Sequence, residues 1–491
     1  MPLSILQITR SANLKHLARA HLSSLSHAQK DEIIRLLFPL IAEVRRLSAR
    51  VAELEARLSK DSHNSSKPPS SDDLAKKSQS PNVPSGKKPG GQPGRAGKTL
   101  ERSMHVDTVI NHPLPPHCQC GAALTGAGVL LHEQRQVIDI PVAHYHVTEH
   151  RTWQTRCTCG QIHQSAFPAE VTEVVQYGPN VRALSVHLTH GQLLPLVRSA
   201  QLITELYGLS VSSGTVYAWS NQAAQLLLPE VTGIAQSLIG LPVVHADESG
   251  LRVASHLHWL HTVASDKLTW YGVHAQRGLP AIKAGGILTH LTGTAVHDCW
   301  GPYWRLNNCL HALCNAHLLR ELTFQRETTR QRWPKRMIDL LIRCRDYCVA
   351  ARQAGQTALS AWRIRRIFKD YNAILNKALV RNPPAQRQAK RRGRTKQSVA
   401  FNLIKRMREH ATEVLRFVTD LRVPFTNNLA ERAIRMPKVK QKISGCFRTL
   451  QGAQTFCIIR SYLDTMRKQG HNMFEVLRQT FIGRPLSHDS G

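Results

Sequence analysis

Apolar residues recur in a heptad pattern near the start of the chain. Alternating steps of four and three residues separate Leu40, Val44, Leu47, Val51, Leu54 and Leu58. This spacing predicts a helix with the a/d seam of a coiled coil, and Val at a with Leu at d favours a parallel dimer. Pro39 is expected in the first turn of this helix. We assign residues 1–60 to an N-terminal helical or coiled-coil segment; the alternative is one amphipathic helix packed within its own domain.

Polar residues, Gly and Pro replace the heptads in the next segment, residues 61–104. The stretch 76–98, KKSQSPNVPSGKKPGGQPGRAGK, carries six Lys or Arg residues and no acidic residue. This composition predicts a flexible basic linker. Its Gly-rich backbone also suits a minor-groove arm, in which Lys87, Lys88 and Arg95 would contact DNA. A solvated linker without DNA contacts is the alternative.

Short strand-like runs and two paired cysteines characterise residues 105–170. Cys118 and Cys120, and then Cys157 and Cys159, each form a C-x-C-G motif. Two short loops that each offer two thiolates predict a tetrahedral four-cysteine Zn²⁺ site. We therefore expect a small zinc-binding module here, and four reduced thiols without a metal are the alternative.

Helical periodicity returns in residues 171–235. One helix is predicted to run to Leu206 and a second to begin near Ser212 or Ser213, with the turn Tyr207–Gly208–Leu209 between them. This is the shape of a helix-turn-helix, whose second helix reads DNA in a major groove. Any two-helix hairpin would have the same pattern.

In residues 236–465 the helical periodicity gives way to strand-like apolar runs and helices, the pattern of an α/β domain. Apolar β-branched runs predict three strands, a helix and a fourth strand, which is the opening of an RNase H-like fold. A long helical stretch is predicted at about 333–420, interrupted by a basic loop at 387–396. Residues 466–491 form a C-terminal segment. The fold class is multidomain α/β, in which the RNase H-like domain follows the coiled coil, the basic linker, the zinc-binding module and the helical region.

Composition narrows the class of protein. The 491 residues include 65 Lys or Arg against 33 Asp or Glu, a net charge of +32 that indicates a polyanionic partner, with nucleic acid first. No apolar run is long enough for a transmembrane helix, and the first residues do not have the pattern of a secretory signal, so we expect a cytoplasmic protein without membrane contacts. Eleven cysteines, an odd number, in a chain without a secretory signal pattern argue against a disulfide framework.

Three carboxylates occupy positions where they could converge. Asp247 is predicted to end the first strand, Asp298 the fourth, and Glu431 to lie about one turn into a late helix. In an RNase H-like sheet the first and fourth strands are neighbours, so these acids would meet at one point. Three close carboxylates repel each other unless divalent cations bridge them, which predicts a site for Mg²⁺ or Mn²⁺. Taken singly, each acid is more often a turn, cap or surface residue than a metal ligand, and only the combination of the three favours a metal site.

Other residues near these acids have predicted roles. Glu248 should point to the opposite face from Asp247 and is not expected to bind the same metal. Cys314 and His317 are a possible metal pair, for which we favour a structural role, and Asn427 or Asn428 is expected to cap the helix of Glu431. A basic strip without balancing acids is predicted to bind the DNA backbone through Arg432, Arg435, Lys438, Lys440, Lys442 and Arg448.

Several motifs together closely resemble the transposases of the insertion-sequence-66 family, from about Leu40 to about Leu477. The matching stretches are NSSKPPSSD, GGQPGRAG, the C-x-C-G pairs, YGPNVRA, VVHADESGLRV, HDCWGPYW, CNAHLLREL, TNNLAERAIRMPKVKQKISGCFRT and GAQTFCIIRSYLDT. The resemblance implies a DDE-class enzyme with an RNase H-like core, a helical insertion in that core at about 333–420 and a catalytic triad at Asp247, Asp298 and Glu431. This chain departs from the family at Ser249, where Thr is more frequent, and in its first cysteine pair, where C-x-x-C is common.

The resulting functional hypothesis is a DNA transposase of an insertion sequence. It would bind the element ends, hydrolyse a phosphodiester there with divalent metal, and join the freed 3′-hydroxyl to target DNA. Expected partners are DNA, a second copy of the chain when the ends are paired, and, by the resemblance, small accessory proteins of the same element. The alternatives are a catalytically inactive DNA-binding regulator and a metal-dependent nuclease without strand transfer.

Overall fold

The computed structural model describes residues 26–61, 64–65, 101–124, 129–141, 143–385 and 395–490. Lys87, Lys88, Arg95 and most of the basic loop at 387–396 therefore lie outside the described residues. The chain divides into two compact units. Unit 1 comprises Met1–Pro81, Val296–Cys299 and His311–Asn427, and unit 2 comprises Asn82–Ala295, Trp300–Leu310 and Asn428–Gly491.

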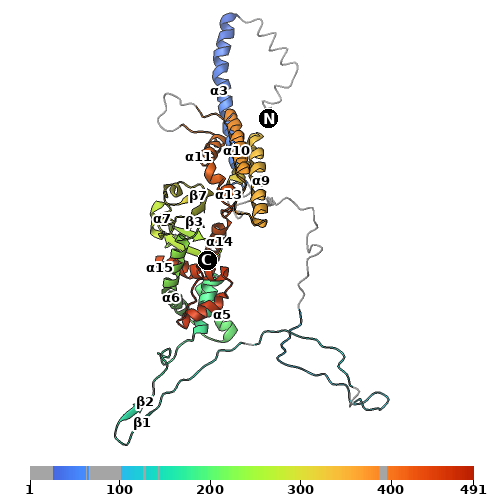
Figure 1. Cartoon of the computed structure of the whole chain (residues 1–491), viewed down its shortest axis with the longest axis vertical. Helices are drawn as coiled ribbons and strands as arrows, with labels where there is room; N and C mark the ends of the chain where they lie inside the picture. The colour runs from blue at the N-terminus through green and yellow to red at the C-terminus, as the bar shows by residue number, and fades with distance from the viewer. Residues whose placement is uncertain are drawn as a thin grey trace. The chain divides into compact units, whose positions relative to one another are not determined.

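The heptad segment of unit 1 forms a single helix, α3 (His27–Leu58), as Figure 1 shows. Its predicted seam residues are exposed, from 43% at Leu54 to 81% at Leu58. A seam that pairs with a second copy of the helix must be exposed in the isolated chain, so this exposure is compatible with a coiled coil. The expectation that Pro39 occupies the first turn is wrong, because α3 begins at His27 and contains Pro39 in its interior. The residues before Pro39 are mostly good helix formers, so the helix starts upstream of it.

Helices make up most of the rest of unit 1, as predicted for residues 333–420. They are α8 (Asn315–Thr329), α9 (Trp333–Gln353), α10 (Ala361–Arg381), α11 (Val399–Glu409), α12 (Ala411–Val414) and α13 (Arg416–Thr419). Their apolar faces pack together: α8 lies on α9, α9 on α10, and α10 on α11. Tyr371 of α10, which is fully buried, donates its hydroxyl to the Met407 carbonyl at 2.8 Å and ties α10 to α11.

A five-stranded sheet has the order β5-β4-β3-β6-β7. Its strands are β3 (Val243–Val253), β4 (His256–Ala264), β5 (Thr269–His274), β6 (Thr294–His297) and β7 (Leu310–Leu313). The first three form an antiparallel meander, with α7 (Leu279–Gly285) before β6. The first and fourth strands of the domain are therefore neighbours, as predicted, while β7 was not predicted.

Helices of unit 2 bury a second apolar core. They are α4 (Pro179–Val186), the π-helix η2 (His187–Gly191), α5 (Leu196–Tyr207), α6 (Ser213–Ile239), α15 (Leu450–Lys468) and α16 (Met473–Phe481). The remaining helix, α14 (Asn428–Ser444), packs against β3 and β4. α15 packs against both β5 and α6 and so joins this core to the sheet (Figure 1). Of its nineteen residues twelve are buried, which makes α15 the central helix of the unit.

The predicted zinc-binding segment contains little regular structure. Its described residues form a hairpin of two three-residue strands, β1 (Gln154–Arg156) and β2 (Ile162–Gln164), and an isolated bridge between His117 and Ala123. Each of these short pairs encloses one C-x-C-G motif. Among the described residues, no helix has both the length and the apolar character that crossing a bilayer requires.

Candidate functional site

Asp247 lies on β3, in unit 2. It is the fifth residue of an eleven-residue strand and pairs with Thr262 of β4. The prediction that Asp247 ends its strand is wrong, because Glu248 to Val253 continue the hairpin in unbroken register with β4. A polar run after Asp247 predicts a strand end. In the outer part of a hairpin, however, alternate side chains face solvent, so polar residues also occur within a strand. The carboxylate is thus held by paired backbone on both sides of it.

Asp298 follows directly after β6, in unit 1, as predicted for a strand end. All four residues of β6 are buried, so the position of Asp298 is set by a fully packed strand. The preceding His297 bonds through Nδ1 to the Asp298 carbonyl and through Nε2 to His311 Nδ1 at 2.9 Å. Burial lowers the pKa of His297 to about 3, so this ring is neutral near pH 7 and orients the backbone without adding charge.

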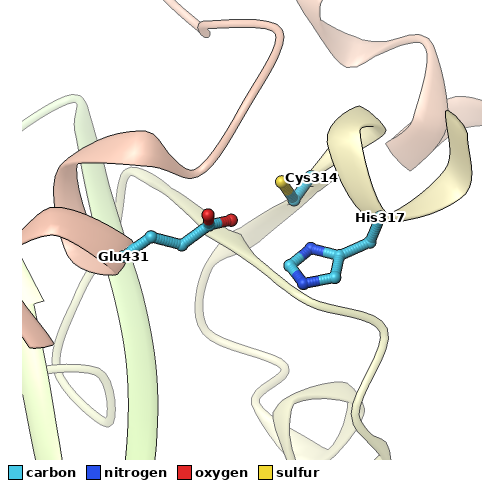
Figure 2. A group of neighbouring side chains, drawn as sticks. All are labelled: Cys314, His317 and Glu431. Carbon is cyan, nitrogen blue, oxygen red and sulfur yellow. The ribbon is translucent and has the colours of Figure 1, made fainter. Parts of the chain in front are cut away.

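Glu431 is the fourth residue of α14, in unit 2, which confirms its prediction about one turn into a late helix. A carboxylate in the first turn faces the partial positive charge of the helix N-terminus. Figure 2 shows its side chain extending from this turn. Asn427, one of the predicted caps, lies immediately before α14 and is 1% exposed.

Cys314 and His317 lie at the start of α8, in unit 1, and Figure 2 shows both side chains. Cys314 occupies the N-cap position, and its thiol accepts the backbone N–H of Asn427 at 3.2 Å. This contact ties α8 to the residue that precedes α14, which supports the structural role that we favoured for Cys314.

Glu248 belongs to a buried network that sequence reasoning missed. Its side chain is 1% exposed and accepts from Arg277 at 2.7 Å and from the Tyr303 hydroxyl at 2.5 Å. The Arg277 guanidinium also lies over Trp259 and Trp300, 4.8 and 4.1 Å from the ring centroids. Glu248 is thus used as a structural anion beside Asp247. The tryptophans of HWLH and HDCWGPYW were the available signal, but the partner Arg277 lies outside both motifs.

The basic strip that begins on α14 and ends at Arg448 divides into exposed and inward-facing cations. The Lys438 ammonium donates to the Gly250 carbonyl at 2.6 Å, and Lys440 lies over the rings of Phe447 and Phe456. Burial lowers the pKa of both Lys438 and Lys440. The remaining members of the strip are exposed to solvent: Arg432, Arg435, Lys442 and Arg448. Sequence spacing could not separate the two groups.

The two cysteine pairs have the same local geometry. In each motif the first cysteine N–H donates to a carbonyl four residues on, and the glycine N–H donates back to the first cysteine carbonyl, all at 2.8–2.9 Å. Gly121 and Gly160 have φ of 87° and 90°, a conformation that favours glycine at both positions. The backbone N–H groups of Cys120 and Cys159 lower the pKa of Cys118 and Cys157. Within the described part of the chain, the four thiols are exposed and do not form one cluster.

The two-helix motif has the predicted boundaries within one residue. α5 ends at Tyr207, Gly208 is left-handed at φ 69°, and the Ser212 hydroxyl caps α6 by accepting the Thr215 N–H at 3.0 Å. However, α6 contains no Lys or Arg, and its apolar face is buried against α4, α15 and α16. A recognition helix without cations would depend on other segments for phosphate contacts.

Known proteins provide an independent comparison. The family described as "Transposase IS66 family" matches residues 174–455, which include β3, β6, α14 and all three carboxylates. A family of unknown function (DUF6444) matches residues 14–101. An uncharacterized protein of Sinorhizobium fredii, y4jD, is 22% identical over 352 residues, which cover 65% of this chain and 66% of that protein. Because the family match spans more than half of the chain, this protein belongs to the IS66 family of transposases.

Proposed function

We propose that this chain is a DDE-class transposase that cuts DNA at the ends of its element and joins the freed ends to target DNA. Water would break a phosphodiester bond and leave a 3′-hydroxyl on the element. That hydroxyl would then attack a target phosphodiester, forming one new P–O bond as another breaks. No protein–DNA covalent intermediate is needed in this scheme, and Asp247, Asp298 and Glu431 would be the catalytic residues.

The observation that carries this proposal is the strand order β5-β4-β3-β6-β7. It is the order expected of an RNase H-like sheet, with the strand of Asp247 next to the strand that ends at Asp298. Glu431 comes from α14, which packs against β3 and β4 in unit 2. The three acids thus come from a strand, the end of the adjacent strand and the first turn of a helix.

The donor set fits a hard divalent cation such as Mg²⁺ or Mn²⁺. Asp247, Asp298 and Glu431 offer only carboxylate oxygens, the ligands that these ions prefer. When bound, such ions supply Lewis-acid activation of water and charge stabilisation in phosphoryl transfer. The chain's own contribution is to hold the carboxylates on rigid elements, since β3 and β6 are paired strands and Glu431 lies within a helix.

We also propose a structural Zn²⁺ held by Cys118, Cys120, Cys157 and Cys159. The matching backbone geometry of the two knuckles supports it. The backbone N–H groups of Cys120 and Cys159 also lower the pKa of Cys118 and Cys157, which favours the thiolate that zinc binds. Both pairs belong to unit 2. Binding would draw the two hairpins together and order a segment that buries little surface by itself.

Removing one knuckle cysteine should remove the metal. Purified chain is expected to contain about one Zn²⁺, and Cys157→Ser is expected to lower the content to near zero, since three ligands and a hydroxyl bind zinc far more weakly. Metal analysis of the dialysed protein measures this. Cys446→Ser, at an exposed cysteine outside the pairs, is the matched control and should keep its zinc. Full zinc content in Cys157→Ser would contradict the assignment.

DNA binding is proposed to involve the exposed cations after Glu431. Arg432, Arg435, Lys442 and Arg448 are exposed, whereas Lys438 and Lys440 make interior contacts, so the four exposed cations are the better candidates for phosphate contacts. Lys87, Lys88 and Arg95 remain predicted contacts in the basic linker. A second copy of the chain, paired along the exposed seam of α3, would allow two ends to be held together.

A strand-transfer assay tests the proposed reaction. A labelled duplex with the terminus of the DNA element that encodes this chain is incubated with the protein, Mg²⁺ and a supercoiled target plasmid. We expect label joined to the plasmid, and an unrelated duplex of equal length should not be joined. Nicking without joining would instead indicate a simple nuclease. A mobility shift without cleavage would indicate a DNA-binding regulator.

A further inference from the structure

Helix α14 contains a proline, Pro437, in its interior. In an α-helix each N–H donates to the carbonyl four residues earlier, and proline has no N–H. The Ala433 carbonyl therefore lacks its intrahelical donor. The hydroxyl of Tyr271, on β5, donates to this oxygen at 2.9 Å. A side chain of the sheet thus replaces the missing hydrogen bond, two residues after Glu431.

Tyr271 is itself held firmly in the core. It is 2% exposed, and its backbone N–H donates to the Ser461 hydroxyl at 2.9 Å. The same hydroxyl donates to Asp464 Oδ2 at 2.8 Å, so its single proton is shared between the Ala433 carbonyl and this carboxylate. Burial, together with the Asp464 carboxylate, raises the pKa of Tyr271 well above its usual value. The hydroxyl therefore keeps its proton near neutral pH and can act as a donor there.

The part of α14 beyond Pro437 has its own attachment to the sheet. Lys438 Nζ and Gln441 Nε2 donate to the Gly250 carbonyl at 2.6 and 3.3 Å. Gly250 lies on β3, three residues after Asp247. A proline inside a helix is a frequent point of bending. The turns before Pro437 therefore need a separate restraint, and the contact between Tyr271 and Ala433 provides it.

We infer that Tyr271 is a positioning residue for Glu431. Its hydroxyl fixes the first turns of α14 against β5, while Lys438 and Gln441 fix the later turns against β3. Glu431 is thereby kept in one orientation relative to the strand that carries Asp247. This inference rests on the proposed function, in which Glu431 is one of the three catalytic carboxylates.

The test is Tyr271→Phe in two backgrounds, wild type and Pro437→Ala. Alanine at 437 restores the N–H donor for Ala433, so the tyrosine hydroxyl becomes dispensable. In the wild-type background we expect the single-turnover cleavage rate of a labelled element end to fall about tenfold, with the Kd for that end within about twofold. In the Pro437→Ala background the same substitution should change the rate less than about twofold.

Two control variants complete the design. Tyr462→Phe removes another hydroxyl-to-carbonyl bond, to Leu486 at 3.0 Å, and should leave the cleavage rate unchanged. Pro437→Ala alone should cleave within about threefold of wild type. A larger loss would overturn the inference, because the proline ring, and not the tyrosine hydroxyl, would then hold the first turns of α14 in position.

Other outcomes are equally decisive. Equal losses in both backgrounds would overturn the inference, since the hydroxyl would then act through Asp464 and not through Ala433. A wild-type rate for Tyr271→Phe would also overturn it. Failure of the proposed function would have a different signature, namely wild-type cleavage by Asp298→Asn, so the two failures are distinguishable.

Discussion

Replacing Asp298 with Asn is expected to abolish cleavage of the element end while leaving binding of that end largely intact. Asn keeps the shape of the side chain and removes the negative charge with which a divalent cation would be held. A metal ion stabilises the transition state of phosphoryl transfer by several kcal/mol, so the rate should fall at least about a thousandfold. Single-turnover cleavage in Mg²⁺ measures the rate, and mobility shifts in EDTA measure the Kd.

The matched control is Asp339→Asn, the same substitution on α9 of the same unit. Asp339 is exposed and paired with Lys335 at 2.8 Å, so its loss should not affect cleavage. Wild-type cleavage by Asp298→Asn would remove the basis for a DDE-class reaction. Loss of DNA binding by that variant would place Asp298 in end recognition.

The second large effect concerns stability and is expected for Asp464→Asn. Asp464 and Arg460, on α15, are 3% and 0% exposed and bond at 2.6 Å. Arg460 also donates to the carbonyls of His190 and Gly191 in η2. Removing the anion leaves a buried cation without its partner, which should lower the free energy of unfolding by about 3–5 kcal/mol. Urea titration of the full-length protein measures this.

An exposed pair with the same spacing is the control. Arg366 and Asp370 are also an Arg and an Asp four residues apart on one helix, but their side chains are 61% and 43% exposed. Asp370→Asn should therefore cost less than about 1 kcal/mol. Equal effects of the two substitutions would show that burial does not determine the strength of the Arg460–Asp464 pair.

Burial also lowers the pKa of His190 to about 3, so this neutral ring adds no second charge next to Arg460.

The elements around the candidate site were largely predictable, because their signals are local. Alternation and β-branched runs placed β3, β4, β5 and β6, and the Ser212 cap marked the start of α6. The length of β3 was not predictable in this way. Its outer half contains polar residues that alone resemble a turn, and only the pairing with β4 makes them a strand.

Roles that depend on a distant partner could not be predicted. The strip after Glu431 reads as uniformly basic, yet Lys438 and Lys440 have interior partners while their neighbours face solvent. Glu248 was expected only to point away from Asp247, and its partner Arg277 was unforeseen. In both cases the contact that decides the role joins residues of different elements. Such a pairing leaves no periodic pattern in the sequence from which it could be predicted.

By itself, the sequence determined the family, most of the helices and strands around the candidate site, and the three acids that we propose for it on a basic background. These features depend on residue type, spacing and periodicity, which the chain carries locally. Only the tertiary structure decided which side chains from distant elements supply the hydrogen bonds that these helices and strands need. The Tyr271 hydroxyl reaches the Ala433 carbonyl across 162 residues, to satisfy a hydrogen bond that Pro437 removes. A buried polar group requires a partner wherever the fold can supply one, and that partner is set by packing in three dimensions.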